Sequence, residues 1–428
     1  MILFPAEYNA RKAAVFAALA EAEGSARRLP VIPLSFRDWP ETPARVTTAL
    51  ARAKRQPKGA LARWLKRQLL RGQYNWARAY FTRHPDHLAL AWNGLAGSRM
   101  CFMQGARDAG APRLYAELAP LPGRITLDPA GVNGEGSVPQ DPAFFRQYAT
   151  TTDTTGWRAI GAGLVARASR RADVGQGAGA LPDAPFLFCP LQVPDDSQLT
   201  LFAGWCGGMA GFLAAMTEAA RHLPEGWHLR LKEHPSARTS LAPLLAPLLA
   251  TGRAVLDNGT DSFAQIAASR GVVTVNSSMG LQSFFHDKPV ITLGRAFFAL
   301  PGLVTPAADQ QALNSLFASP GALTYDAALR AAFLTWLDHV YYPRFDTPAD
   351  APPRHDRDAF AAKLALARDF AKSAKETLPP PPYALIGLVA FDTLRRKTDG
   401  LQGRRRRRHG QRGQRNAEHP RRARVSGG

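Results

Sequence analysis

The sequence predicts an α/β protein with two doubly wound, Rossmann-like lobes that face each other across a cleft, followed by a disordered basic tail. Two observations predict the lobes. Short apolar runs alternate with helical stretches along the 428 residues, and a Gly- and Ala-rich segment at 167–185 divides these runs into two sets. The length suffices for two domains of ordinary size, and a hydrophobic content of 46% is typical of a folded protein.

The first set of predicted strands comprises residues 88–94, 113–118 and 123–129, with a helix at 98–108. The second set comprises 185–193, 228–235, 254–258, 271–277 and 289–294, with helices around 199–221 and 261–269. A last helical region, 325–375, is expected to pack back across both lobes. The chain therefore divides into an N-terminal lobe (1–166), a C-terminal lobe (185–324), returning helices (325–378) and a Pro-rich linker with a basic tail (379–428).

The formal net charge of +20 is concentrated at the end of the chain. Residues 393–428 contain 13 Lys and Arg against Asp399 and Glu418, a net charge of +11. Such a segment buries too little apolar surface to offset its ordering entropy, so we expect it to be disordered. It either attaches to nucleic acid or anionic lipid or is a solvated tail with no specific role.

The composition also limits the cellular context. Cys101, Cys189 and Cys206 are too few and too far apart for a disulfide framework or a thiolate metal site, and they fit a reducing cytosol. The first residues contain Glu7 where a signal peptide needs an apolar run. The longest apolar stretch, 199–216, contains four glycines and is predicted to be a buried helix rather than a membrane span.

A basic amphipathic helix is predicted between residues 43 and 85, a segment without Asp or Glu. It could lie on an anionic membrane, because apolar and basic residues share its surface. The alternative, which we take as the default, is an ordinary surface helix whose apolar stripe faces the core. The stripe and its basic neighbours are Leu61, Trp64, Leu65, Leu69, Arg63, Lys66, Arg67 and Arg71.

A candidate phosphate site follows the strand at 271–277. Asn276, Ser277 and Ser278 can cap the helix that is expected at 279–285, and Gly280 permits close backbone approach. The start of a helix attracts anions through its free amides and its dipole. The alternative is a well-capped helix that binds nothing.

A second element supports this site. Lys232 and His234 alternate along the strand at 228–235, so both side chains share one face and would counter a phosphate in the same cleft. The pairing of this strand end with the Asn-Ser-Ser turn is more specific than either motif alone.

These two motifs, KEHP (232–235) and TVNSSMGLQSFFHDKPVITLG (274–294), resemble the capsule polysaccharide synthesis and export family, whose members include retaining β-Kdo glycosyltransferases. Further blocks occur in the family's order and extend the resemblance over roughly 88–305: WNG (92–94), ELAPLPGRITLDPAGVN (117–133), SVPQDPAFF (137–145) and PLQVPDDSQ (190–198). The resemblance implies a GT-B type glycosyltransferase fold with a nucleotide-sugar-binding C-terminal lobe. It also implies CMP-Kdo as donor substrate, with no metal ion and no other cofactor.

The single-module length resembles the branch that adds the first Kdo to a lyso-phosphatidylglycerol anchor. The implied partners are a nucleotide sugar, a lipid acceptor at the inner face of the cytoplasmic membrane and other capsule assembly proteins. The implied location is cytoplasmic and peripheral to the inner membrane. Relatives begin with a strand and a glycine-bearing turn. Neither is predicted before Ala10, so a shortened first lobe is expected.

By resemblance, Asp128 is the nucleophile and Glu117 the acid/base, both at predicted strand ends. The alternatives are a strand-end turn for Asp128 and a surface charge for Glu117. Lys232, His234 and the amides of Ser277 and Ser278 would stabilise the departing phosphate. Gln282 stands where many nucleotide-sugar enzymes of this fold carry a glutamate that holds the ribose.

Three further residues lie in the blocks that resemble the family: Gln192, Asp196 and Asn133. We assign them no role beyond packing or hydrogen bonding near the cleft. Two other functions remain open. The first is a non-catalytic polysaccharide-binding or export module with a glycosyltransferase-like fold. The second, less expected, is a nucleic-acid binder that acts through its arginine run.

Overall fold

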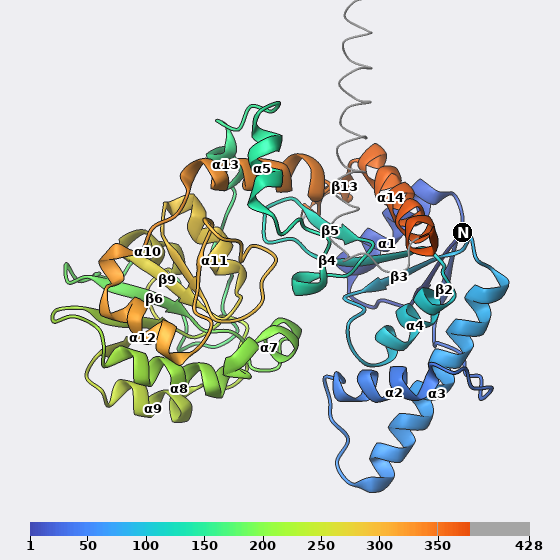
Figure 1. Ribbon diagram of the computed structural model, residues 1–428, viewed down its shortest axis with the longest axis horizontal. Helices are drawn as coiled ribbons and strands as arrows, with labels where there is room; N and C mark the ends of the chain where they lie inside the picture. Colours follow the sequence, from blue (N-terminus) through green and yellow to red (C-terminus); the bar gives the residue numbers. More distant parts are fainter. Residues whose placement is uncertain (349, 377–428) are drawn as a thin grey trace, which may run out of the picture. The chain divides into compact units, whose positions relative to one another are not determined.

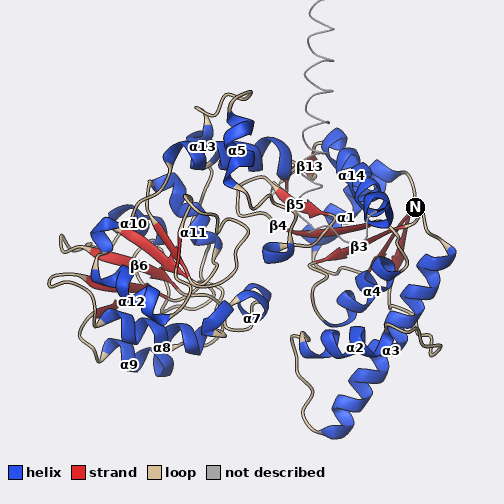
Figure 2. Ribbon diagram, viewed as in Figure 1, coloured by secondary structure: helices blue, strands red, loops and turns tan. Residues whose placement is uncertain are grey.

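The computed structural model describes residues 1–348 and 350–376, which form two α/β lobes, each built on its own sheet (Figures 1 and 2). The predicted fold class, α/β with two Rossmann-like lobes, is confirmed by these sheets. The linker and disordered basic tail predicted for 379–428 lie outside the described residues.

The first sheet has five strands in the order β2-β1-β3-β4-β5. All neighbours pair in parallel except β4 and β5, which are antiparallel. The strands are β1 (Ile2–Pro5), β2 (Ala26–Leu29), β3 (Leu88–Trp92), β4 (Arg113–Leu118) and β5 (Ile125–Asp128).

The expectation of a shortened first lobe is wrong, because β1 is a strand near the middle of this sheet. Ile2 pairs with Ala26 of β2 on one side and with Leu88 of β3 on the other. Four residues closed by a proline are too short to show strand periodicity in the sequence. The glycine of the expected turn is missing, and Asn9 instead caps α1 (Ala10–Glu23) by accepting from the Lys12 amide at 3.2 Å.

Helices cover both faces of the first sheet. On one face, α1 packs against the last described helix, α14 (Arg357–Glu376). On the other face lie α2 (Thr42–Ala51), α3 (Ala60–Arg83) and α4 (Gly97–Asp108). At the crossing of α3 and α4, a Cβ on Gly105 would come within 2.6 Å of the Ala77 side chain, so only glycine fits there.

The second sheet has six parallel strands in the order β11-β10-β9-β6-β7-β8. These strands are β6 (Phe186–Pro190), β7 (His228–Lys232), β8 (Ala254–Leu256), β9 (Gly271–Thr274), β10 (Val290–Thr292) and β11 (Thr305–Pro306). Its largest core is shared with α8 (Met209–Ala220), α9 (Ala242–Leu249) and α12 (Gln310–Ala318). The other face carries α10 (Ser262–Ala268) and α11 (Ser278–Gln282), and α11 continues as a 3₁₀ turn over Ser283–His286 (Figure 1).

The apolar stretch 199–216 is not one helix. It forms the end of α7 (Ser197–Phe202), a 3₁₀ turn at Gly204–Cys206 and the first residues of α8. Gly204 and Gly207 both adopt a φ of +66°, which only glycine tolerates without strain, and this interrupts the helix. Within residues 1–348 and 350–376, no helix combines the length and the hydropathy needed to cross a bilayer.

The chain passes between the lobes at two places. After β5 it runs through a 3₁₀ turn at Asn133–Glu135 to α5 (Pro142–Ala149) and α6 (Trp157–Ile160), which contact α13 (Ala327–Trp336). It returns through α13 and a π-helical turn at Leu337–Tyr341 to β12 (Phe345–Asp346) and β13 (Arg354–His355), beside the first sheet.

Residues 142–160, which the sequence assigned to the first lobe, thus pack with the second. The aromatic rings explain this, because Phe145 packs edge-on against Phe333 and Trp336, and Trp157 packs against Phe285. The segment 169–177 that follows is also held by the second lobe. The Arg170 amide donates to the Pro235 carbonyl and the Gly175 amide to the Asn258 carbonyl, each at 2.8 Å.

Candidate functional site

A cleft of about 820 Å³ lies between the lobes, at the carboxyl ends of several strands. In open α/β sheets this edge is where ligands bind. Its lining is largely polar and comes from both halves of the chain. The first lobe contributes Lys12, Arg52, Lys54, Arg55, Lys66, Asn93, Arg99, Glu117 and Asn133. The chain after this lobe contributes Arg167, Gln192, Asp195, Asp196, Ser197, His234, Ser277, Ser278 and Gln282.

Glu117 is held in the cleft by the WNG turn at the end of β3. Asn93 adopts a left-handed φ of 61°, uncommon for a residue with a side chain. In this conformation its Nδ2 donates to Glu117 Oε2 at 3.0 Å and to Ser197 Oγ of the second lobe at 3.3 Å. Gly94 follows with a φ of +73°, and a Cβ there would lie 2.7 Å from the Tyr115 ring, so both its backbone conformation and its surroundings favour glycine.

Burial raises the pKa of the Glu117 carboxyl above its usual value, although the hydrogen bonds from Asn93 and from the Leu118 amide act in the opposite direction. A carboxyl with a raised pKa exchanges protons closer to neutral pH, as general acid–base catalysis requires. Glu117 therefore lies in the cleft with a carboxyl whose pKa is raised. No cation pairs with it among the described residues.

His234 lies in the cleft as a neutral imidazole. Its Nδ1 accepts a hydrogen bond from the Ser236 amide at 3.0 Å, so the proton of the neutral ring is on Nε2. Burial, and next the nearby positive charge of Arg167, lower its pKa to about 4. The sequence left the charge of this residue open. In the structure it is a neutral donor at pH 7.

Positive charge dominates the cleft. Lys12, Arg52, Lys54, Arg55, Lys66, Arg99 and Arg167 line it, against the carboxylates of Glu117, Asp195 and Asp196. Some of these charges are partly neutralised by ion pairs: Arg52 with Glu135 at 2.8 Å, Lys54 with Asp195 at 3.1 Å, and Arg99 with Glu7. The excess of cations in a concave site attracts anionic ligands.

Asp128, the nucleophile that the resemblance implies, is not among the residues that line the cleft. Its carboxylate is completely buried. Oδ1 accepts from the Ala130 and Gly131 amides at 2.7 and 3.1 Å, and Oδ2 accepts from the amide and hydroxyl of Ser137 and from the Tyr341 hydroxyl, all at 2.7 Å. A carboxylate that accepts five hydrogen bonds is stabilised as an anion and shielded from a substrate.

This network ties the two crossings of the chain together. Ser137 lies on the way from β5 to α5, and Tyr341 ends the helical segment that returns to the first lobe. In this conformation Asp128 therefore joins the two connections between the lobes.

Three further predicted binding residues do not reach the cleft either. The Lys232 Nζ donates to the carbonyls of Gly175, Asn258 and Thr260 at 2.6–2.9 Å, which anchors the loops beside β7. Burial lowers the pKa of this lysine. Strand alternation had predicted that Lys232 and His234 share one face. The strand ends at Lys232, however, so His234 lies beyond it and lines the cleft, whereas the Lys232 side chain is enclosed.

Asn276 and Gly280 support the strand end rather than a ligand. The Asn276 amide donates to the carbonyls of Gln198 and Phe202 at 2.9 and 3.1 Å and accepts from Gln192 at 2.9 Å. Gly280 is buried, and a Cβ there would lie 3.1–3.2 Å from Thr274 and Phe298.

Ser277, Ser278 and Gln282 do line the cleft. The Ser277 hydroxyl caps α11 by accepting from the Met279 amide at 3.2 Å, and its own amide donates to Thr274 Oγ1 at 3.1 Å. Its amide is thus engaged, and what the serine presents is its hydroxyl proton. Gln282 Nε2 donates to the Pro120 carbonyl of the first lobe at 2.9 Å, so this residue bridges the lobes.

Sequence reasoning missed most of the cations of the cleft. Lys12, Arg99 and Arg167 come from α1, α4 and the segment between the lobes, and no local motif marks them. In residues 1–348 and 350–376, no cluster of three or more His, Cys, Asp or Glu has the arrangement of a metal site.

The fold and the cleft define a two-lobed α/β protein with a cationic site between its lobes. Residues 169–342 match the family described as capsule polysaccharide biosynthesis protein, in agreement with the family that the sequence blocks resemble.

Two curated relatives are similar in sequence. Protein FixF of Sinorhizobium fredii is 28% identical over 321 residues, which cover 74% of this chain and 73% of FixF. The capsule polysaccharide modification protein LipB of Neisseria meningitidis is 28% identical over 147 residues, 32% of this chain and one third (33%) of LipB.

Two solved structures from Thermosulfurimonas dismutans are similar in fold. The KpsC β-Kdo 2,7 transferase matches with a TM-score of 0.46 and 12% identity, over 86% of this chain and 99% of that one. The KpsC β-Kdo 2,4 transferase matches with a TM-score of 0.40 and 17% identity, over 64% and 86%.

Proposed function

We propose that this protein is a glycosyltransferase of capsule polysaccharide biosynthesis that moves Kdo from CMP-Kdo to a lyso-phospholipid anchor. The observation that carries the proposal is the cleft: an excess of Lys and Arg surrounds Glu117, a carboxyl without an ion pair, between two Rossmann-like lobes. CMP-Kdo is anionic at its phosphate and at its sugar carboxylate, so the cationic lining complements it.

The leaving group would be stabilised from the second lobe. When the bond between the anomeric carbon and the phosphate oxygen breaks, its electron pair stays on CMP. His234 would donate its Nε2 proton as a hydrogen bond to that phosphate, Arg167 would supply a fixed positive charge, and the Ser277 hydroxyl a further donor. Preorganised donors of this kind are among the largest contributions to catalysis.

The acceptor would be activated from the first lobe. Glu117, oriented by Asn93, would take the proton of the acceptor hydroxyl as that oxygen forms its bond to the anomeric carbon. Retention through a covalent intermediate on Asp128 stays a prediction. It requires residues 130–137 and Tyr341 to release the carboxylate that they enclose in the described conformation.

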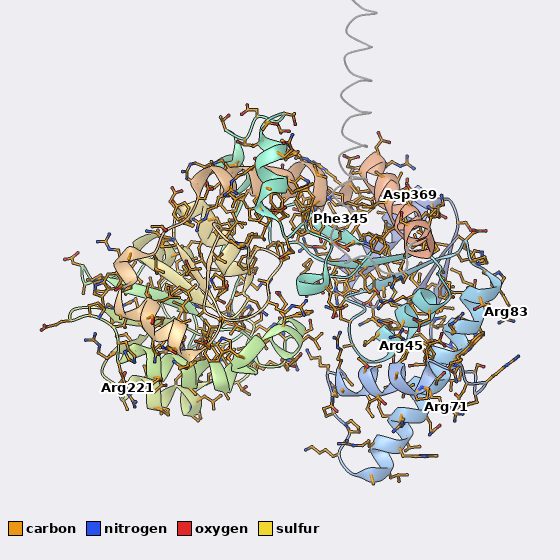
Figure 3. The ribbon with its side chains drawn as sticks, viewed as in Figure 1. Arg45, Arg71, Arg83, Arg221, Phe345 and Asp369 are labelled. Atoms are coloured by element: carbon orange, nitrogen blue, oxygen red, sulfur yellow. The ribbon has the colours of Figure 1, made fainter. Side chains whose placement is uncertain are left out.

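The test combines binding with turnover. Calorimetry with CMP alone should give saturable binding, and Arg167→Gln should weaken it about tenfold or more. Arg221→Gln is the matched control, because Arg221 is an exposed arginine on the outer side of the second lobe that pairs with Glu218 (Figure 3). With CMP-Kdo and lyso-phosphatidylglycerol, mass spectrometry should detect the Kdo-lipid product. A folded protein that binds no CMP would overturn the proposal.

The second candidate is a non-catalytic module that binds the polysaccharide. It is favoured by two observations: Asp128 is enclosed, and Gln282 is used to bridge the lobes. This candidate predicts tight binding of capsule oligosaccharide together with no detectable binding of CMP, the reverse of the first.

A further inference from the structure

The first half of α3 carries an apolar stripe that faces solvent. Leu61 is 70% exposed, Trp64 55%, Leu65 54% and Leu69 37%, whereas Leu70, Tyr74, Ala77 and Phe81 of the second half are buried. The default expectation, a stripe directed to the core, is therefore wrong for residues 61–69. Figure 1 shows this half of α3 extending beyond α4, its packing partner.

The stripe continues onto the loop after β2. Leu34 of this loop packs against Gly72, which lies on the same face of α3 as Leu61, three turns further along the helix. The Ser35 amide donates to the Gly72 carbonyl at 3.0 Å. Leu34 and Phe36 are themselves 47% and 59% exposed. We call the surface formed by Leu34, Phe36, Leu61, Trp64, Leu65 and Leu69 the α3 face. A continuous apolar surface of this kind marks an interaction site.

Uncompensated cations surround the α3 face. Residues 42–85 contain no Asp or Glu. Some arginines nearby are paired: Arg71, further along α3, pairs with Asp38 at 2.6 Å, and Arg45 of α2 pairs with Asp108 at 2.8 Å (Figure 3). By contrast, no ion pair forms between any described residue and Arg55, Lys58, Arg63, Lys66 or Arg67, which cluster around the exposed half of the helix.

We propose that the α3 face docks on a bilayer whose headgroups are anionic. Leucine and tryptophan side chains would enter the boundary between headgroups and acyl chains, and the cations would contact the lipid phosphates. Charge complementarity decides against a second copy of this chain, because a two-fold interface would bring the same unpaired cations together. Docking on anionic headgroups would also explain why several arginines and lysines around the α3 face lack acidic partners among the described residues.

The docked surface adjoins the cleft. Lys66 of α3 and residues 52–55, which connect α2 to α3, line the cleft, and the α3 face begins one turn before Lys66. Docking would therefore bring one rim of the cleft to the level of the headgroups, where a lipid acceptor would reside. The docking itself does not depend on the proposed transfer reaction, since it is a property of this surface alone.

The experiment is flotation of the full-length protein with vesicles of phosphatidylcholine, either pure or containing 30% phosphatidylglycerol. We expect binding to the anionic vesicles only, and partial release in 0.5 M NaCl, where the electrostatic part is screened. Trp64→Gln/Leu65→Gln should lower the partition coefficient at least tenfold in either salt. Lys58→Gln/Arg63→Gln/Arg67→Gln should lower it only at low salt.

The matched control is Leu244→Gln, which removes an equally helical, 44% exposed leucine from α9 of the second lobe and should leave binding unchanged. Unfolding midpoints show that the variants are folded. Equal binding of Trp64→Gln/Leu65→Gln and the unsubstituted protein overturns the proposal, because the basic tail would then account for all attachment. A monomer–dimer transition abolished by the same variant also overturns it, in favour of a protein partner.

Discussion

The side-chain amide of Asn93 donates to Oε2 of Glu117 over 3.0 Å, and the same amide reaches Ser197 of the other lobe. One asparagine in a left-handed conformation thus positions the Glu117 carboxyl in the cleft and connects it to the opposite wall. Strain of this kind persists where the surroundings over-determine a conformation, and such positions cluster at functional sites. In the proposed transfer reaction, Glu117 would be the residue on which the chemistry depends most directly.

Replacing Glu117 by Gln should separate activity from stability. Turnover should fall by about 10²–10⁴-fold, since the proton acceptor is lost while the hydrogen bond to Asn93 can be kept. The raised pKa means that the charged form is disfavoured in the folded state, so the variant should be at least as stable as the parent at pH 7. Kinetics and urea unfolding measure the two effects, with the exposed Glu218→Gln as control. A large loss of stability would contradict the assignment.

Asp128 should affect stability first. Asp128→Ala removes the acceptor of five buried hydrogen bonds, which should destabilise the protein by about 3 kcal/mol or more. Asp128→Asn should cost less, because one oxygen remains. Calorimetric melting of both variants measures this. If Asp128→Asn melts like the parent, binds CMP normally and yet transfers no sugar, the carboxylate acts chemically and the enclosed conformation is not the reactive one.

His234 should make the protein sensitive to mild acid. Its pKa is about 4 in the folded state and near 6.5 when unfolded, so the unfolded state binds a proton first as the pH falls. Stability is therefore lost between pH 6.5 and 4, by about 2 kcal/mol at pH 5. In His234→Asn, whose oxygen can still accept from Ser236, the stability difference between pH 7 and pH 5 should shrink by this amount. Urea titrations at the two pH values test it, and an unchanged difference would refute a neutral His234.

Gln282 should act as a bridge between the lobes. Gln282→Glu places a carboxylate against the Pro120 carbonyl, which now receives a hydrogen bond at 2.9 Å, so the two oxygens would repel each other. The contact should break, and the radius of gyration from X-ray scattering should rise without any gain in CMP affinity. Tighter binding of CMP by this variant would show instead that residue 282 holds the ribose.

Local patterns were sufficient to predict most of the fold. Every strand predicted from an apolar run between polar turns is present, because burial on both faces of a parallel sheet requires such runs. β1 was not predicted, because its short apolar run ends at a proline, and the helix at 199–216 was interrupted by left-handed glycines whose φ the sequence does not reveal.

The candidate site was only partly predictable. Glu117, His234, Ser277 and Ser278, near strand ends, and Gln282, on the helix after β9, line the cleft. Lys232 and Asn276 do not line the cleft. The Lys232 amine and the Asn276 side-chain amide instead donate to carbonyls of residues that are distant in the sequence. Whether a polar side chain faces a ligand or fills a hydrogen-bonding deficit elsewhere depends on the tertiary structure, which spacing along the chain does not encode.

Both connections between the lobes converge on the buried carboxylate of Asp128, whereas Lys54 and Asp195, which also join the lobes, form a solvated pair at 3.1 Å. Such a pair contributes less than about 1 kcal/mol, so ordinary thermal motion parts it. The contacts that join the lobes therefore differ widely in strength, from an enclosed network of hydrogen bonds around Asp128 to an ion pair that opens readily in water.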